Sequence, residues 1–364
     1  MSIDNNNSVK MNTNKEFMNS LKMKIDAVIP LDQRRDVPAH YIKAIQIYLI
    51  TICSYLGLFF TDNYFILIPL CILLGLSLTG IGFNVFHEAV HGSFSKSKNI
   101  NKYVSVVSCS LIGVSRMLWK HKHNFLHHQY PNIQNLDDDL ETRGNLRLSP
   151  HQELLTKYKY QHLYAIFLYG MTTIEWVFIK DFVQYFSLKM NEFQEVPKFK
   201  TSEHIEFWFS KLCYFILFVV IPLQHFSFPQ FAIGLFIVNY SMSLALVSIF
   251  QLAHVMEESL FPVANDPQYK SEPIDWVKLQ LDTTVNFAAR NKFVTWYAGG
   301  LNFQIEHHLL PKISHIHYPK IAPLLEETAK EFNFPYYKFD NYGGALKSHY
   351  NILKILGSHK EIPA

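Results

Sequence analysis

The feature that most constrains the fold of this 364-residue chain is the grouping of its apolar residues into two pairs of long uncharged runs. The first pair covers residues 44–60 and 64–83, and the second covers 212–228 and 231–253, which meet around Pro229 and Gln230. A bilayer core about 30 Å thick requires about 20 apolar residues of helix. The runs therefore predict an all-α polytopic membrane protein with four transmembrane helices in two hairpins.

Basic residues are distributed unevenly around these runs. The positive-inside rule places segments rich in lysine and arginine in the cytoplasm. We therefore expect both termini in the cytoplasm and both hairpin tips, which have no lysine or arginine, on the opposite side of the membrane. Residues 1–40 contain no apolar core of a cleavable signal peptide. The basic residues up to the first run are Lys10, Lys15, Lys22, Lys24, Arg34, Arg35 and Lys43.

Two further apolar segments, 104–118 and 163–179, carry the charged residues Arg116 and Glu175. If either segment alone crossed the membrane, everything after it would move to the other face. The distribution of histidines argues against such a change of side. We therefore interpret both segments as interfacial or re-entrant helices beside a cytoplasmic histidine-rich cap.

Histidine is unusually frequent, with 18 residues in a chain that is 49% hydrophobic and only 17% charged. The formal net charge of +3 argues against a nucleic-acid-binding protein. Eight histidines cluster in short groups, and the predicted topology places all of them at or beyond the same membrane face. These eight are His87, His91, His123, His127, His128, His254, His307 and His308.

The spacing of the clustered histidines indicates metal binding. His87 and His91, like His123 and His127, are four residues apart and share one helix face, and His128 lies on the adjacent face. Neutral imidazole is a ligand for iron, zinc, copper and nickel, and eight nitrogens are too many for one ion. Two metal ions are therefore implied. Isolated histidines are more often hydrogen-bonded structural residues, which is how we interpret His40, His121, His151, His162, His204, His225, His349 and His359.

Two rival motifs overlap the first histidine pair. His87-Glu88-Ala89-Val90-His91 matches the H-E-x-x-H signature of zinc proteases, in which the glutamate is the general base. That interpretation leaves the other histidine groups unexplained. Glu88 and His91 also fit the Glu-x-x-His of ferritin-like di-iron proteins, but those bundles need a second such motif, which this chain lacks.

The histidine groups, in their order, resemble the three histidine boxes of the integral-membrane fatty acid desaturases. The third box, in which glutamine replaces the first histidine, is similar to that of the front-end desaturases, which act at Δ5 or Δ6. The stretches 122–130, 299–302 and 311–319 agree as well, and the resemblance covers roughly residues 40–335. The boxes are His87-x-x-x-His91, His123-x-x-x-His127-His128 and Gln304-x-x-His307-His308.

The resemblance implies that the eight clustered histidines hold two iron ions. His254 lies outside the boxes, and Gln304 is a further candidate ligand because related enzymes carry histidine there. The implied reaction uses O2 and two electrons to remove two hydrogens from adjacent methylenes of an acyl-CoA or acyl-lipid, within an apolar tunnel. A related histidine-box hydroxylase or a sphingolipid desaturase is the alternative.

The chain has no His-Pro-Gly-Gly haem motif and no length for a fused cytochrome b5 domain. We therefore expect a separate electron donor, either cytochrome b5 or a ferredoxin. The expected organisation is a partly disordered N-terminal tail over 1–39 with an amphipathic stretch at 17–29, a desaturase domain over 40–335, and a cytoplasmic C-terminal extension over 336–364.

Acidic, histidine and aromatic residues near the boxes also need interpretation. The simplest interpretation of the acidic run 137–139 with Glu141 is a solvated loop, and the alternatives are support of a metal ligand or docking of the electron donor. We assign no role to His315 and His317 beyond a hydrogen bond to a ligand. Four aromatic residues could line a tunnel, although anchoring at the membrane interface is the better interpretation of any one of them. They are Trp119, Trp176, Trp296 and Tyr297.

Overall fold

The computed structural model describes residues 3–263 and 275–358, with residues 3–12 described by their backbone alone; His359 lies outside these ranges. Within them the protein is mostly helical, and its regular strands are the two-residue β1 (Asn286–Phe287) and β2 (Lys338–Phe339), which pair in parallel. The all-α class is therefore confirmed.

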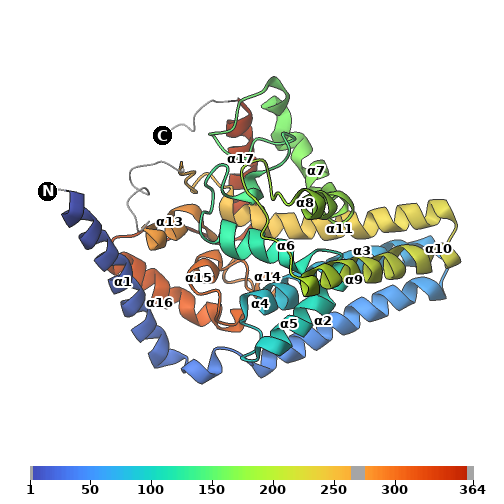
Figure 1. The fold of residues 1–364 in the computed structure, drawn as a ribbon, viewed down its shortest axis with the longest axis horizontal. Helices are drawn as coiled ribbons and strands as arrows, with labels where there is room; N and C mark the ends of the chain where they lie inside the picture. The colour runs from blue at the N-terminus through green and yellow to red at the C-terminus, as the bar shows by residue number, and fades with distance from the viewer. Residues whose placement is uncertain (1–2, 264–274, 359–364) are drawn as a thin grey trace.

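The long helices extend to one side of the molecule, and both hairpin tips lie at their far end (Figure 1). Helix α3 packs against both α2 and α11, which joins the two hairpins into one bundle. Phe60 and Phe65 at the first tip are 85% and 91% exposed, as expected for side chains that face lipid. The elements are α2 (Pro38–Gly57) with η2 (Leu58–Phe60), α3 (Tyr64–Ile81), α9 (Thr201–Phe215) with η8 (Ile216–Val220) and α10 (Ile221–His225), and α11 (Phe228–His254).

The second hairpin tip differs from the predicted one. The chain turns at Phe226 and Ser227, and α11 begins at Phe228, so Pro229 lies inside the first helical turn. Proline is favoured there because the first turn has no intrahelical partner for its N–H group. Ser227 and Gln230 form a capping box that fixes this start. The predicted tip at Pro229 and Gln230 was therefore wrong by one helical turn.

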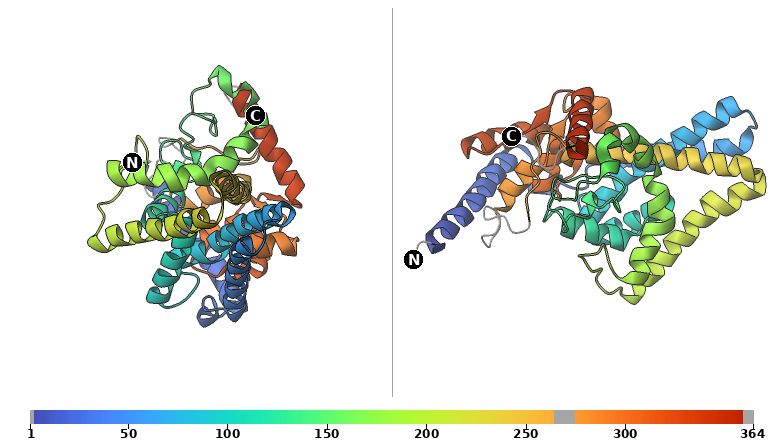
Figure 2. Two further views of the ribbon diagram at one scale, coloured as in Figure 1. Left: turned by 90° about the vertical axis from the view of Figure 1, so that its right-hand side faces the viewer. Right: turned by 90° about the horizontal axis from the view of Figure 1, so that it is seen from above.

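Within the described ranges, length and composition qualify five helices, rather than four, to cross a membrane. The additional one covers Thr156–Ser187 and contains the segment that we expected to be interfacial. Figure 2 shows its central part, α7, crossing α11 rather than running along it. It consists of η6 (Thr156–Tyr160), α7 (Gln161–Glu175), η7 (Trp176–Lys180) and α8 (Asp181–Ser187). The candidates are Leu31–Phe60, Tyr64–His91, Thr156–Ser187, Thr201–His225 and Phe228–His254.

The other apolar segment that carries a charged residue, 104–118, is not one helix. Helix α5 (Lys98–Ile112) ends at Gly113, whose φ of +81° favours glycine, and α6 (Arg116–Lys120) follows. A side chain at Gly113 would also lie 2.7 Å from the ring of Tyr214. The break leaves α5 too short to be a candidate span.

A cap of further helices, most of them short, covers the end of the bundle opposite the tips (Figure 1). Residues 3–28 are helical, and the predicted amphipathic stretch of this α1 packs Phe17, Leu21 and Ile25 against α16, where Lys24 also pairs with Glu331 at 2.8 Å. The cap elements are α1 (Ile3–Val28), η1 (Leu31–Gln33), α4 (His87–His91), η5 (Asp138–Leu140), α13 (Trp276–Thr283), α14 (Lys292–Tyr297), α15 (Gln304–Leu309), η9 (His315–His317), α16 (Tyr318–Glu331) and α17 (Tyr342–Ser358).

The C-terminal segment is packed against the rest of the chain. Strand β2 pairs with β1, and α17 lies against α7 and α11. His349 of α17 contacts the carbonyl oxygen of Val255 through Nδ1 at 2.7 Å and the hydroxyl of Tyr169 through Nε2 at 3.0 Å. The domain boundaries at 39/40 and 335/336 stay predictions.

A buried ion pair joins the second hairpin to the helices beside it. Lys211 of α9 donates to Asp181 at 2.7 Å and to the carbonyl oxygens of Gly113 and Val177 at 2.7 and 2.9 Å. Asp181 also accepts the backbone N–H of Ser115 at 2.7 Å. Both charged side chains are buried, so each depends on the other for compensation.

We expect Lys211→Met to lower the free energy of unfolding by about 3–5 kcal/mol, because Asp181 is then left buried without its counter-charge. Thermal unfolding in detergent measures this change. The double variant Lys211→Met/Asp181→Leu removes both charges and should recover much of the loss. A double variant as unstable as the sum of the two single variants would contradict this account.

Candidate metal centre

All eight histidines predicted as ligands lie in one buried cluster at the cap end of the bundle. Within each group of this cluster, the potential ligand atoms lie within 4.8 Å of one another. His128 lies next to His123 and His307 on one side of the cluster and next to His308 on the other. The groups are His87, His91, His123 and His307; His127, His254 and His308; and His128, His307 and His308.

Two π-helical turns orient the first two boxes. The π-helix η3 (Gly82–Phe86) directly precedes α4, and η4 (His121–His127) contains the second box. In η4 the backbone N–H of His128 donates to the carbonyl oxygen of His123, five residues earlier, at 3.0 Å. The wider turn brings His128 onto the side that His123 occupies, whereas we predicted an adjacent face from α-helical geometry.

The distances between ring nitrogens fit ligands that surround a metal ion. The Nε2 atoms of His87 and His123 are 3.1 Å apart, and the Nε2 atom of His128 lies 3.2 Å from that of His123 and 3.0 Å from that of His307. With metal–nitrogen bonds of about 2.0–2.1 Å, neighbouring ligands are separated by about 3.0–3.4 Å. The donor set is therefore suited to transition metals that bind imidazole.

Hydrogen bonds on the outer side of three imidazoles leave their inner nitrogens available. The Nδ1 atom of His127 lies 3.0 Å from Asp137, that of His254 lies 3.1 Å from the carbonyl oxygen of Thr283, and that of His308 lies 2.7 Å from Oε1 of Gln280. A donating Nδ1–H leaves the lone pair on Nε2. The Nε2 atoms of His254 and His308 are buried and have no hydrogen-bond partner, which is costly unless an ion binds them.

Burial keeps the cluster largely uncharged. It lowers the pKa of His123, His128, His307 and His308 well below the usual range, and neighbouring imidazoles add to the effect. Burial also opposes the charged form of His127, but the nearby carboxylates, Asp137 foremost, outweigh it and raise its pKa. Neutral imidazoles present the lone pairs that metal binding requires.

Two of these outer partners were not the preferred expectation from the sequence. A solvated loop was the simplest interpretation of the acidic run, and it was wrong for Asp137 and Asp138, which are nearly completely buried. Asp137 instead has the alternative role, support of a histidine in the cluster. Asp138 accepts a hydrogen bond from Lys180 at 2.7 Å. The proximity of Asp137 to the second box was the available signal. Gln280 had no signal, because 28 residues separate it from His308.

Glu88 does not join the histidines of its own motif. It forms a separate buried group with His40 and His315, and its Oε2 atom accepts the backbone N–H of His315 at 3.2 Å. The ammonium group of Lys43 donates to Nε2 of His315 at 3.0 Å. To act as a general base beside a metal held by His87 and His91, the carboxylate of Glu88 would have to face those two histidines rather than His40 and His315. The zinc-protease interpretation is therefore disfavoured.

The other residues singled out near the boxes differ in their hydrogen-bond partners. Gln304 is buried at the start of α15, and its Nε2 atom has no hydrogen-bond partner, so its role as a ligand through Oε1 stays a prediction. His317 lies 2.9 Å from the carbonyl oxygen of Gln33. The described contacts of His315 and His317 include no hydrogen bond to a predicted ligand. Tyr297 donates to the carbonyl oxygen of Leu76 at 2.9 Å.

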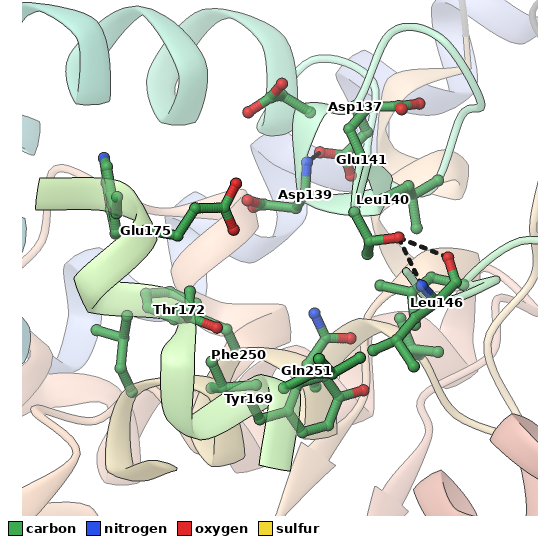
Figure 3. A pocket seen from close by; sticks show the side chains of 18 of the residues that line it. Asp137, Asp139, Leu140, Glu141, Leu146, Tyr169, Thr172, Glu175, Phe250 and Gln251 are labelled. Atoms are coloured by element: carbon green, nitrogen blue, oxygen red, sulfur yellow. Dashed lines mark hydrogen bonds between the residues drawn. The ribbon is translucent and has the colours of Figure 1, made fainter. Parts of the chain in front are cut away.

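A cavity of about 270 Å3 borders the cluster at His123 and His254. Figure 3 shows that acidic side chains from residues 137–141 lie on one side of it and that Tyr169 and Gln251 lie on the other. Trp119 and Trp176 line this cavity, which favours the tunnel role over membrane anchoring for these two; Trp296 and Tyr297 are not among its lining residues.

Comparison with known proteins gives a consistent result. The profile of the fatty acid desaturase family matches residues 63–340. The chain is 34% identical over 354 residues, 96% of this chain and 94% of the relative, to an sn-1 linoleoyl-lipid 6-desaturase of Arthrospira platensis. It is 32% identical to the enzyme of the same description from Synechocystis, over 96% of this chain and 98% of the relative. An acyl-lipid (8-3)-desaturase of Physcomitrium patens is 31% identical over 83% of this chain and 63% of the relative.

The hydrogen bond between Gln280 and His308 gives a test of the centre. We expect Gln280→Leu to weaken metal binding by about 10- to 100-fold, because Nδ1 of His308 loses its acceptor. Gln280→Glu keeps an acceptor oxygen and is the matched control. Metal retained during competition with a chelator measures the effect. Equal retention in Gln280→Leu and the unchanged protein would contradict the orientation that we assign to His308.

Proposed function

Because the chain belongs to the fatty acid desaturase family, we propose that it inserts a cis double bond into an acyl chain of a membrane lipid, on the carboxyl side of an existing double bond. That the chain is a fatty acid desaturase, an oxidoreductase, rests on the family profile and on relatives that span nearly its whole length. The lipid-linked substrate and the Δ6 position are supported by the two relatives described as linoleoyl-lipid 6-desaturases.

We assign the eight clustered histidines as ligands of two iron ions, with His128 between His123 and His308, and Gln304 as a further candidate ligand. When bound, the irons supply the activation of dioxygen and the abstraction of two hydrogens. In the overall reaction –CH2–CH2– becomes –CH=CH–, and O2 takes up those two hydrogens, two electrons and two protons to form two molecules of water.

The protein supplies the position of the substrate and the environment of the centre. The cavity beside His123 and His254 has an exposed charged rim that includes Arg143 and Glu175, and an apolar wall that includes Leu146 and Phe250. A lipid head group fits the rim, and an acyl chain fits the wall. Such a channel fixes which methylenes lie at the centre and keeps water from them.

The topology that we propose keeps four transmembrane helices in two hairpins. The crossing of α7 over α11 supports an interfacial position for α7 and α8. Both termini and the histidine-rich cap then face the cytoplasm, together with the active site. This face gives access to a separate electron donor, for which we propose cytochrome b5 or a ferredoxin.

The observation that carries this proposal is the convergence of all three histidine boxes and His254 on one buried cluster. Expression in a host with defined fatty acids, followed by gas chromatography of its lipids, tests the function. We expect linoleoyl chains to gain a double bond at Δ6. Unchanged lipids in the presence of inserted protein, oxygen and an active donor would contradict the proposal, and a hydroxylated product would show a hydroxylase.

The histidines themselves can be tested with a matched control. We expect His127→Ala and His307→Ala to abolish desaturation while the protein still inserts, because each substitution removes a proposed ligand from a buried site. His225→Ala, at the exposed far end of the bundle, should keep the activity. Activity in either cluster variant, measured by the same chromatography, would remove the mechanism.

A further inference from the structure

Gly82 occupies a helical position at which neither the backbone nor the packing requires glycine. It stands between α3 and the first histidine box, with a φ of −54° that any residue adopts. A Cβ atom built on Gly82 meets nothing within 4 Å. By contrast, a Cβ on Gly75 of α3 would lie 2.1 Å from Oγ of Ser241. Glycine is a poorer helix former than alanine, so glycine at this position lowers the stability of the helix, and no close packing contact or unusual backbone angle requires it.

Gly82 also lines a small apolar cavity of about 30 Å3 beside the metal centre. His87, a proposed iron ligand, lines this cavity together with Thr79 of α3, Ile112 of α5 and Met242 of α11. The small cavity therefore lies where the histidine cluster meets the long helices.

The same four side chains line both the small cavity and the larger one with the charged rim. The larger cavity borders the cluster at His123 and His254, and the small cavity borders it at His87. A chain that enters at the charged rim and passes the centre would therefore continue toward Gly82. The shared side chains are Trp119, Trp176, Leu246 and Phe250.

We propose that Gly82 is a specificity-determining residue that keeps space for the part of the acyl chain beyond the metal centre, and so sets the longest chain that the enzyme accepts. This inference rests on the proposed desaturase function. Because the cavity is small, each added methyl group in its wall should matter. The position of the new double bond, counted from the carboxyl end, is set on the rim side of the centre and does not depend on Gly82.

Gly82→Ala and Gly82→Val test the inference in a host supplied with dienoic chains of 16, 18 and 20 carbons. One methylene in a tight apolar pocket changes discrimination by roughly 10- to 200-fold. We expect Gly82→Ala to lower conversion of the longest accepted chain about tenfold relative to the chain two carbons shorter, and Gly82→Val to lower it further. The double bond that forms should keep its distance from the carboxyl end.

Gly234→Ala is the matched control, because its Cβ would lie 3.8 Å from Sγ of Cys71 in a different cavity near the hairpin tips. It should leave the chain-length preference unchanged. Thermal unfolding gives a readout that is independent of activity: Gly82→Ala should be at least as stable as the unchanged protein, since its new methyl group enters open space.

Three results would overturn the role of Gly82. They are an unchanged chain-length preference in both variants, an equal loss for all chain lengths, and a lowered unfolding temperature in Gly82→Ala. Failure of the proposed function would look different, because the unchanged protein would then desaturate none of the supplied chains.

Discussion

The structure depends on the burial of eight imidazoles in one cluster at the end of a helical bundle. Several ring nitrogens in this cluster have no hydrogen-bond partner within the described chain, among them Nε2 of His91, His254 and His308. Each unsatisfied buried polar group costs about 1–3 kcal/mol. Metal ions remove this cost, because they bind the lone pairs that burial keeps unprotonated. The cluster is therefore stable as a metal centre and costly as an empty one.

The surrounding elements orient this cluster. The π-turns η3 and η4 direct the first two boxes inward, α11 ends at His254, and the cap contributes α15. Asp137, Gln280 and the carbonyl oxygen of Thr283 fix the orientation of three rings from outside. The same end of the bundle carries the cavities, so the hydrogens to be removed can lie beside the centre while the rest of the acyl chain stays in apolar surroundings.

Local patterns pointed to the histidines that the structure gathers into one cluster, but not to most of the contacts that support them. Four-residue spacing pointed to two histidine pairs, and the end of an apolar run pointed to His254, because these signals lie within a few residues. His307 and His308 were assigned from the resemblance of the third box. Glu88 shows the limit: its motif suggested a base beside His87, but its partners His40 and His315 lie far away in the sequence. Hydropathy likewise identified apolar helices but did not show that α7 crosses α11. The apolar composition of a segment does not determine the direction of its helix axis relative to the other helices.

The number and identity of the bound metal ions test the central claim most directly. Elemental analysis of protein purified from iron-supplemented cells, combined with Mössbauer spectroscopy of 57Fe-enriched protein, measures both. The eight-histidine cluster predicts two irons per chain, with spectra typical of nitrogen-rich ligation. A single ion per chain, or stoichiometric zinc without iron, would contradict the account.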